Sequence, residues 1–365
     1  MKIVILADTI DNQKAGIYVY TKNLIKALQN LKDKNLKLIF IHKKENDFFN
    51  GTENYIIPRK HIPGYDSLRK FYLIPKLVKK LQPDAVVEPC HIGPFGLPKN
   101  IKRVTIIHDL TPILFPELHV KRSVIIHKLL LKKVLKKTDL IVVPSETTKA
   151  DVLRYSKTKS PIVVIREGID HAEKVPENSA EILQKFGIKK PYILFVGTIE
   201  PRKNLDILID AFTEIKAKNS IPNQLVLAGA KGWKCKKIME KVRKNKDIVL
   251  TGHITGTEKA ALYSGCDFFA YPSLYEGFGL PPLEAMSYGK AVICSTGGAL
   301  KELFSAHALT FAAHDKEVLK NHIISLINNP DLRDSLAQKG LIFAKNFTWD
   351  KTANELLTFL DKMVK

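Results

Sequence analysis

The sequence predicts an α/β protein made of two doubly wound, Rossmann-like domains. Its 365 residues suffice for two domains of ordinary size, and with 45% apolar residues each domain can bury a sizeable core. The same strand–loop–helix order opens both halves of the chain. Lys2–Ala7 is a short apolar run followed by a polar loop and a helical pattern at Ile17–Asn30. Tyr192–Val196 likewise precedes a turn and a helical pattern at Leu205–Ala217.

The first domain is expected over residues 1–170. Short apolar runs predict buried parallel strands at Lys2–Ala7, Lys37–His42, Asp84–Glu88, Arg103–Ile107, Leu140–Pro144 and Pro161–Ile165. The stretches between them predict helices at Ile17–Asn30, Tyr65–Leu81 with an interruption at Pro75, Pro116–Thr138, and Glu146–Tyr155 behind a Ser145 cap. Strands that alternate with helices in this way favour a parallel sheet.

The second domain is expected over residues 171–347 and repeats the alternation. Its predicted strands are Tyr192–Val196, Gln224–Ala228, Ile248–Leu250, Asp267–Ala270 and Ala291–Cys294. Its predicted helices are Ala180–Phe186, Leu205–Ala217, Glu258–Gly265, Pro282–Tyr288, a helix from Ala299, Lys316–Asn328 and Asp331–Asn346. A further helix begins near Phe347.

The charge of the chain is strongly basic and unevenly distributed. Lys and Arg number 58 against 37 Asp and Glu, a net charge of +21, of which residues 1–170 carry +15. A basic half suggests an anionic partner such as nucleic acid, a phospholipid surface or a phosphorylated substrate, and solvated lysine faces are the competing explanation. The Pro116–Thr138 segment mixes lysines with apolar residues, which suits either an interfacial membrane helix or, as we favour, a helix packed on the sheet.

The four cysteines indicate neither a metal site nor a disulfide framework, because Cys90, Cys235, Cys266 and Cys294 are far apart in the sequence. This fits a reducing cytoplasm. The first apolar run ends at Asp8, too early for a signal peptide, and no run approaches the ~20 residues that span a bilayer. We therefore expect a cytoplasmic protein, with peripheral contact to the cytoplasmic face of an anionic membrane through its basic N-terminal domain.

The stretch Tyr271–Glu284, Y-P-S-L-Y-E-G-F-G-L-P-P-L-E, is the strongest functional signal. An apolar strand enters it and a helix leaves it, and Gly277 and Gly279 allow a tight turn between them. Prolines suit the first turn of the helix, where no amide donor is needed, and the free N–H groups there attract anions or hydroxyl-rich ligands. A plain strand–helix connection would explain the glycines and prolines but not the position of Glu276 in the turn itself.

This stretch resembles the retaining glycosyltransferases of family 4, which have the two-domain GT-B fold. The wording E-G-F-G-L-P-P-L-E-A-M-S-Y-G-K-A-V-I follows their pattern almost without a gap. The resemblance implies that Glu276 meets the donor sugar and Glu284 the nucleotide ribose. It also implies that the turn and helix start between them bind the donor, through Gly277, Phe278, Gly279 and Leu280. The wording is nearest to members that transfer mannose from GDP-mannose onto lipopolysaccharide or polysaccharide precursors.

Two further motifs carry the resemblance. In G-T-I-E-P-R-K-N, Arg202 and Lys203 occupy a strand-to-helix turn, where a diphosphate needs a guanidinium fork and an ammonium. The family has this wording, and its Arg and Lys grip the donor diphosphate. In I-H-D-L-T-P, the resemblance places His108 beside the donor sugar, against the alternative of an ordinary core histidine. Asp109 stays open, since it can simply cap the next helix.

The resemblance adds weaker assignments. Gly16 corresponds to a glycine near the donor phosphates, and a plain helix-start glycine is an equal alternative. His253 and Ile254, after a Thr-Gly, correspond to backbone that faces the nucleotide base. The crossover glycine Gly168 matches, but Arg166 and Glu167 replace the usual Pro and Asn before it. The last helix, about 348–365, is expected to pack back on the first domain.

The expected enzyme is a retaining hexosyltransferase that uses a UDP- or GDP-sugar as co-substrate. The acceptor, a glycan or a lipid-linked glycan, would enter mainly from the first domain into a cleft between the two. No Asp-x-Asp motif is present to hold a divalent cation, so Arg202, Lys203 and helix-start amides would neutralise the leaving diphosphate, and neither a metal nor another cofactor is expected.

Three other classes of protein compete with this expectation. A nucleotide-sugar epimerase of the same shape would need acid–base groups at the sugar ring. An NAD-dependent oxidoreductase would need G-x-G-x-x-G after the first strand, which is missing. A nucleic-acid-binding protein would need aromatic platforms or a known binding motif, and neither is found. No nucleic acid is therefore expected as a partner.

Overall fold

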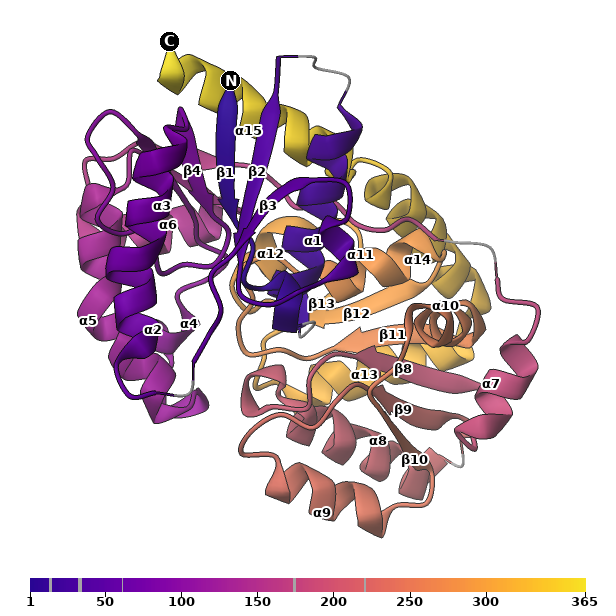
Figure 1. Cartoon of the computed structure of the whole chain (residues 1–365). Coiled ribbons are helices and arrows are strands. Elements are labelled where there is room, and N and C mark those ends of the chain that lie inside the picture. Colours follow the sequence, from indigo (N-terminus) through magenta and orange to yellow (C-terminus); the bar gives the residue numbers. More distant parts are fainter. Residues whose placement is uncertain (13–14, 32–34, 61, 173–174, 220) are drawn as a thin grey trace. The chain divides into compact units, whose positions relative to one another are not determined.

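The computed structural model describes residues 1–12, 15–31, 35–60, 62–172, 175–219 and 221–365 (Figure 1). The chain divides into two compact units. Unit 1 comprises Met1–Gly168 and Trp349–Lys365, and unit 2 comprises Ile169–Thr348. Each unit has its own parallel sheet and its own core, which confirms the predicted pair of doubly wound Rossmann-like domains.

Unit 1 contains a seven-stranded parallel sheet in the order β3-β2-β1-β4-β5-β6-β7. The strands are β1 (Lys2–Leu6), β2 (Lys37–His42), β3 (Glu53–Ile56), β4 (Ala85–Glu88), β5 (Lys102–Ile106), β6 (Leu140–Val143) and β7 (Ile162–Val164). The helices are α1 (Ala15–Asn30), α2 (Tyr65–Leu68), α3 (Ile74–Leu81), α4 (Thr111–Leu114), α5 (Lys121–Lys137), α6 (Glu146–Ser156) and α15 (Trp349–Val364).

Unit 2 contains a six-stranded parallel sheet in the order β10-β9-β8-β11-β12-β13. The strands are β8 (Tyr192–Val196), β9 (Gln224–Ala228), β10 (Ile248–Gly252), β11 (Phe268–Tyr271), β12 (Ala291–Ser295) and β13 (Leu309–Phe311). The helices are α7 (Ser179–Lys185), α8 (Leu205–Asn219), α9 (Lys236–Lys244), α10 (Gly256–Gly265), α11 (Leu280–Ser287), α12 (Ala299–Phe304), α13 (Lys316–Asn328) and α14 (Pro330–Ala344).

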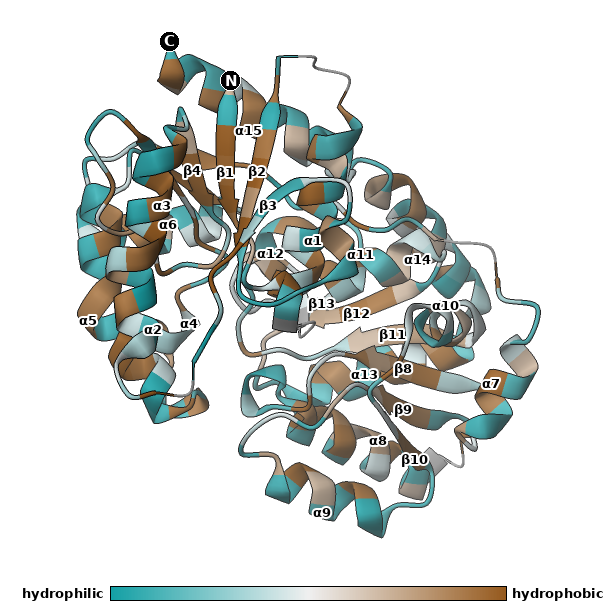
Figure 2. Cartoon of the chain, viewed as in Figure 1, coloured by the Kyte–Doolittle hydropathy of each residue, from teal (hydrophilic) through white to brown (hydrophobic). Residues whose placement is uncertain are grey.

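The cores follow from the apolar strands. Figure 2 shows that most strand residues are apolar, whereas the helices alternate apolar and hydrophilic residues. Central strands such as β8 and β12 are buried along their whole length, as expected where helices cover both faces of a parallel sheet. Helix α15 contributes Trp349, Ala353, Leu356 and Leu360 to the core of unit 1. The hydroxyl of Thr352 also donates to the carbonyl of Arg166 at 2.8 Å.

Several elements differ from those that the sequence predicts. Strands β3 and β13 and helices α4 and α9 were not expected, because each is short or carries few apolar residues. The interruption expected at Pro75 is wrong: the chain stays helical from Tyr65 to Leu81, with a π turn at Arg69–Leu73. Pro75 has no amide hydrogen to donate to the preceding turn, and the helix accommodates it directly after the π turn.

The strand orders place one switch point in each sheet. In unit 1, strands β2 and β3 lie on one side of β1, and strands β4 to β7 lie on its other side, so the switch point falls between β1 and β4. In unit 2 the switch point lies between β8 and β11. Ligands of doubly wound sheets bind beyond the carboxyl ends of the strands at such points. The loops after β1, β4, β8 and β11 are therefore the places to look for a site.

Candidate active site

A cluster of charged side chains lies beyond β8 and β11 in unit 2. Glu276 accepts hydrogen bonds from Arg202 Nη1 at 2.6 Å and from Lys203 Nζ at 2.7 Å, one on each carboxylate oxygen. Lys203 Nζ also donates to Tyr271 Oη at 2.6 Å, and Arg202 Nη2 donates to Glu200 Oε1 at 2.8 Å. The fold thus brings together two segments that lie about 70 residues apart in the sequence, and both were predicted from the sequence to belong to the site.

Burial makes this cluster electrostatically strong. Glu276 is only 8% exposed and Lys203 only 7%. Burial alone would raise the pKa of Glu276, but Arg202 and Lys203 outweigh it and hold that pKa at about 2. Burial lowers the pKa of Lys203 and raises the pKa of Glu200. In the described part of the chain, Glu200 Oε2 is buried with no hydrogen-bond partner.

The glycine turn before α12 holds the backbone of Glu276 in place. The amide of Ala299 donates to the carbonyl of Glu276 at 2.9 Å, and Glu276 forms a parallel bridge with Gly298. Gly298 has φ of 62°, and a Cβ there would lie 2.4 Å from the Glu276 carbonyl oxygen. This close approach requires glycine, so the turn fixes the backbone that carries Glu276.

Glu284 lies on the first turns of α11 and is also buried. Its Oε1 accepts from Lys259 Nζ at 2.6 Å, and its Oε2 accepts from Tyr263 Oη at 3.0 Å. Burial opposes the charge of Lys259, but Glu284 outweighs it and raises the pKa of Lys259. Tyr263 stacks on Tyr288 with ring centroids 5.4 Å apart. The carboxylate is thus held in place by two side chains of α10.

The turn between the two glutamates presents backbone rather than side chains. Gly279 has φ of 129°, and a Cβ there would lie 2.9 Å from Leu300 and Phe304. The Phe278 side chain is in the core of unit 2, and Leu280 packs partly against that core. Gly277 forms a further interaction within the structure. A donor could therefore meet Phe278 and Leu280 mainly through their amides at the start of α11.

The weaker candidates differ in exposure. His253 is exposed and Ile254 half-buried, in the loop between β10 and α10. Gly16 is exposed on the first turn of α1, and a Cβ there would meet no described heavy atom within 4 Å. The packing of the described residues therefore does not require glycine at position 16, which leaves room beside the helix start for a ligand.

His108 of unit 1 has both ring nitrogens occupied. Its Nδ1 contacts Glu167 Oε1 at 2.9 Å and its Nε2 contacts the Pro89 carbonyl at 2.9 Å. The Pro89 carbonyl can only accept, so Nε2 donates to it, and an ionised Glu167 carboxylate accepts from Nδ1 in the same way. These two acceptors favour the doubly protonated ring. Burial opposes this charge, but Glu167 outweighs burial and raises the pKa of His108. The amide of His108 also donates to His91 Nε2 at 3.1 Å, so in this conformation neither the ring nitrogens nor the amide is open to a sugar.

Several residues of these networks were missed as site residues. Tyr271, Lys259 and Glu167 each bind a predicted site residue. Lys259 and Tyr263 are four residues apart on one helix face, a spacing that could have marked them as a pair. Glu167 explains the departure from the usual Asn before the crossover glycine, because its carboxylate pairs with His108. Among the described residues, no group of three His, Cys, Asp or Glu could hold a metal ion.

Two parallel Rossmann-like sheets, with a buried arginine–lysine–glutamate cluster at the switch point of the second, define a glycosyltransferase of the GT-B fold. The model of the family described as Glycosyltransferase Family 4 matches residues 15–173, and that of Glycosyl transferases group 1 matches residues 178–343. The chain is 30% identical over 274 residues to the O-antigen chain mannosyltransferase B of Escherichia coli, a match that covers 73% of this chain and 72% of that protein.

The chain therefore belongs to glycosyltransferase family 4. It is also 29% identical over 344 residues to an uncharacterised glycosyltransferase of Methanocaldococcus jannaschii, with 92% of this chain and 91% of that one covered. Its fold is similar to that of HepE from Anabaena in complex with UDP-glucose, with a TM-score of 0.78, 17% identity and coverage of 99% and 100% of the two chains. These relationships do not favour the epimerase alternative.

Proposed function

We propose that this glycosyltransferase moves a hexose from a nucleotide-diphosphate sugar to a hydroxyl of a glycan or lipid-linked acceptor in cell-surface polysaccharide or lipopolysaccharide synthesis, with retention of the anomeric configuration. The observation that carries the proposal is the buried cluster of Arg202, Lys203 and Glu276 at the switch point of β8 and β11. A guanidinium and an ammonium at that edge fit a diphosphate, and a carboxylate between them fits sugar hydroxyls.

The chemistry we propose is positioning combined with electrostatic stabilisation. As the glycosidic bond breaks, negative charge develops on the diphosphate, and Arg202 and Lys203 stabilise it in a site with little water. Glu276 holds these two cations in place and orients the donor sugar, while Glu284 takes the ribose hydroxyls. The acceptor hydroxyl attacks on the face from which the diphosphate leaves, and a phosphate oxygen of the donor takes its proton.

The identity of the donor sugar and its nucleotide is the first property to determine. The Escherichia coli relative is named as a mannosyltransferase and the HepE structure holds UDP-glucose, so GDP-mannose and UDP-sugars are the donors to compare. A ligand that binds only the folded state raises the thermal midpoint. We expect one nucleotide sugar in a thermal-shift panel to raise the midpoint more than the others. No shift with any UDP- or GDP-sugar would contradict the proposed function.

We further propose that turnover needs no divalent metal, because Arg202 and Lys203 already supply positive charge at the expected position of the diphosphate. Donor turnover should be the same with EDTA as with added magnesium. Loss of turnover in EDTA, restored by magnesium, would contradict this part of the proposal.

Peripheral contact with an anionic membrane of the cytoplasmic face is the last part of the proposal. Helix α5 exposes Ile125 and Leu129, at 55% and 63%, beside several lysines. Apolar residues flanked by lysines suit the interface of an anionic membrane. In the ranges that the structure describes, no helix is long and apolar enough to cross a bilayer. Sedimentation with vesicles containing phosphatidylglycerol, but not with neutral vesicles, is expected, and a double change of Ile125 and Leu129 to Ser should weaken it.

A further inference from the structure

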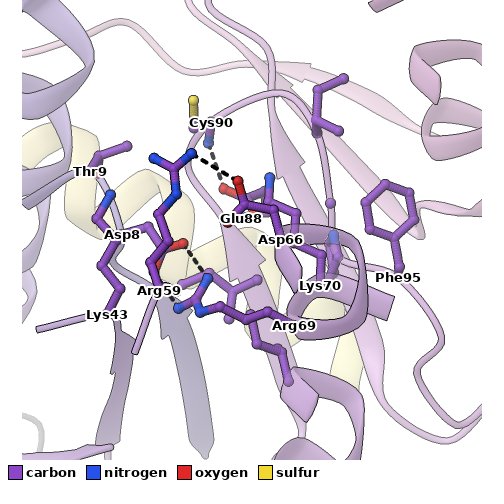
Figure 3. Close-up of a pocket in the computed structure, with 15 residues that line it drawn as sticks. Asp8, Thr9, Lys43, Arg59, Asp66, Arg69, Lys70, Glu88, Cys90 and Phe95 are labelled. Carbon is purple, nitrogen blue, oxygen red and sulfur yellow. Dashed lines mark hydrogen bonds and ion pairs between the residues drawn. The ribbon is translucent and has the colours of Figure 1, made fainter. Parts of the chain in front are cut away.

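A pocket of about 240 Å³ opens beyond β1 and β4 of unit 1 (Figure 3). It lies at the switch point of the first sheet, the position that corresponds to the cluster in unit 2. Asp8 and Thr9 come from the loop after β1, Glu88 from the end of β4, and Lys70 from the helical segment before α3. All of these residues belong to unit 1, so the pocket is formed within it.

Part of the pocket wall is fixed by internal pairing. Arg69 is 3% exposed and binds both oxygens of Asp8, at 2.6 and 2.7 Å, and its Nε donates to the Ile57 carbonyl at 2.7 Å. Arg59 pairs with Asp66 at 2.9 Å at the exposed rim. These pairs neutralise one another, so they shape the pocket and leave its selectivity to the other polar groups.

Glu88 is buried, and half of its carboxyl has no partner. It is 8% exposed, and its Oε1 accepts from the amide of Cys90 at 3.0 Å. Its Oε2 makes no hydrogen bond with any residue that the structure describes. Thr9 Oγ1, also in the pocket wall, is buried without a hydrogen-bond partner in the described part of the chain. A buried polar atom without a partner is costly, so this hydroxyl indicates a site that a ligand completes.

The lysines of the pocket give it a positive balance. Lys43 and Lys70 both line it, and Lys70 forms no hydrogen bond or ion pair with the described residues. Burial raises the pKa of Glu88 to about 8, against a smaller opposing effect of Lys70, so this carboxyl is largely protonated at neutral pH. It then donates a hydrogen bond and adds no negative charge. The apolar part of the wall includes Phe95, which packs against Phe71 with ring centroids 4.4 Å apart.

We propose that this pocket binds the acceptor through a negatively charged group, a phosphate or a carboxylate on a saccharide, held by Lys43, Lys70 and the carboxyl of Glu88. Two ammonium groups and a carboxyl donor select an anionic oxygen, and the aromatic and aliphatic wall suits the C–H face of a sugar ring. The proposal rests on the proposed function, because it names the class of acceptor that the transferase uses.

Direct binding separates this proposal from the proposed function. Isothermal titration with mannose, mannose 6-phosphate, glucuronic acid, inorganic phosphate, UDP and GDP tests the pocket and the donor site with different probes. We expect an anionic sugar to bind about tenfold more tightly than mannose, the size of one charge-assisted contact. Preference for mannose 6-phosphate over glucuronic acid identifies a phosphate acceptor, and the reverse identifies a carboxylate.

Two variants locate the site. Lys70→Gln should weaken binding of the anionic sugar about tenfold, whereas Lys80→Gln, exposed on α3 and outside the pocket, should not. Equal binding of neutral and anionic sugars, no binding of any sugar, binding of inorganic phosphate as tight as that of the sugar phosphate, or an unchanged Lys70→Gln would each overturn the proposal. Failure of UDP and of GDP to bind would contradict the donor site instead, whatever the saccharides do.

The pH dependence gives a second measurement. The charged groups around Glu88 are Lys70, Asp8, Arg69 and, beyond Cys90, Asp109. As the pH rises past about 8, Glu88 ionises and repels the anion, so affinity of the parent for the anionic sugar should fall. Glu88→Gln keeps the size and a donor but does not titrate, so its affinity should not fall through this range. The same fall in both proteins would assign the pH dependence elsewhere and overturn the role of Glu88.

Discussion

Glu276 and Glu88 occupy corresponding places in the two sheets and differ in their surroundings. Both are 8% exposed and lie beyond central strands at a switch point. Glu276 is bound by Arg202, Lys203 and Tyr271, and its pKa is about 2. Glu88 has a single backbone donor, and its pKa is about 8. Burial acts on both carboxyls, and the neighbouring cations decide which one is charged.

The two sites therefore differ in how far their charged and polar groups are already paired before a ligand binds. The site in unit 2 carries its countercharges before any ligand arrives, as electrostatic preorganisation requires. Each site has a buried oxygen without a hydrogen-bond partner, Glu200 Oε2 in unit 2 and Thr9 Oγ1 in unit 1. In unit 1, however, no described cation forms an ion pair with the buried Glu88, so a ligand has to complete the pocket. A donor with a diphosphate leaving group suits the first, and an acceptor that arrives and departs in each cycle suits the second. The following predictions test whether the two sites are as different as this comparison implies.

The largest effect is expected for Lys203→Ala. It removes a buried cation that stabilises the leaving diphosphate and leaves Glu276 with Arg202 as its only cationic partner in the structure described. Turnover should fall by roughly 10² to 10³, about 3–4 kcal/mol, with a smaller change in folding stability. Steady-state kinetics and thermal unfolding measure the two effects. Lys237→Ala, an exposed lysine on α9, is the matched control.

Arg202→Ala should act in the same direction. Normal turnover in both variants would show that the cluster is structural, and the contrast with unit 1 would lose its functional meaning.

The two glutamates of unit 2 should separate in kinetics. Glu276→Gln should lower kcat by roughly 10² because charge and shape change at the sugar as its bond breaks, whereas Glu284→Gln should act mainly on KM. Free UDP or GDP gives a direct comparison, since it lacks the sugar. Glu276→Gln should bind the nucleotide about as well as the parent, and Glu284→Gln should bind it less well.

The folded state of both variants is checked first, because Glu284 also anchors Lys259 and Tyr263. Loss of nucleotide affinity in Glu276→Gln alone would reverse the two roles.

Glu88 and Glu276 should affect stability at opposite ends of the pH range. The folded-state pKa of Glu88 is raised from 4.5 to about 8, so its contribution is greatest below 4.5 and is lost as the pH rises to about 8. The folded-state pKa of Glu276 is lowered to about 2, so its contribution is present above 4.5 and is lost as the pH falls towards 2. Between pH 4.5 and 8, Glu88→Gln should lose on the order of 4 kcal/mol less stability than the parent.

Denaturant unfolding at the two pH values measures this, with Glu117→Gln, on a short turn after α4, as control. An equal loss in the parent and Glu88→Gln would show that Glu88 is solvated and charged, like an ordinary carboxylate.

The sequence predicted the charged residues of the unit 2 cluster but not their partners. Arg202, Lys203 and Glu276 stand in motifs with unusual local wording, between strands and helices that alternate clearly. In the sequence, Tyr271 looks like any other strand residue, and Lys259 is one of many lysines in a basic chain. Their roles depend on which loops meet at the sheet edge, which a single sequence does not state.

The pocket in unit 1 was missed for the same reason. Glu88 ends a short apolar strand, D-A-V-V-E, and nothing in its neighbours shows that the residue is buried beside Lys70. The strand β3, which extends the sheet, was also missed, because E-N-Y-I has only two apolar residues. Long-range pairing with β2, rather than local preference, makes it a strand.

The smallest effect is expected for Glu167→Gln, which extends the comparison to a third buried glutamate. Like Glu276, Glu167 faces a basic side chain, since its Oε1 lies 2.9 Å from Nδ1 of His108. Because Glu167 raises the pKa of His108, the ring should stay charged above the usual pH of about 6.5, and this stabilisation is lost as the pH rises through the raised pKa. Glutamine removes the charge that outweighs burial, so the titration midpoint of His108 should fall. The protein should lose about 1 kcal/mol of folding stability at pH 6 and less at pH 9.

Nuclear magnetic resonance of the histidine Cε1–H groups follows the titration of the ring directly, and Glu146→Gln, an exposed partner of Lys149, is the control. An unchanged midpoint of His108 would mean that the Pro89 carbonyl alone holds the ring. The carboxylate at position 167 would then have no electrostatic role.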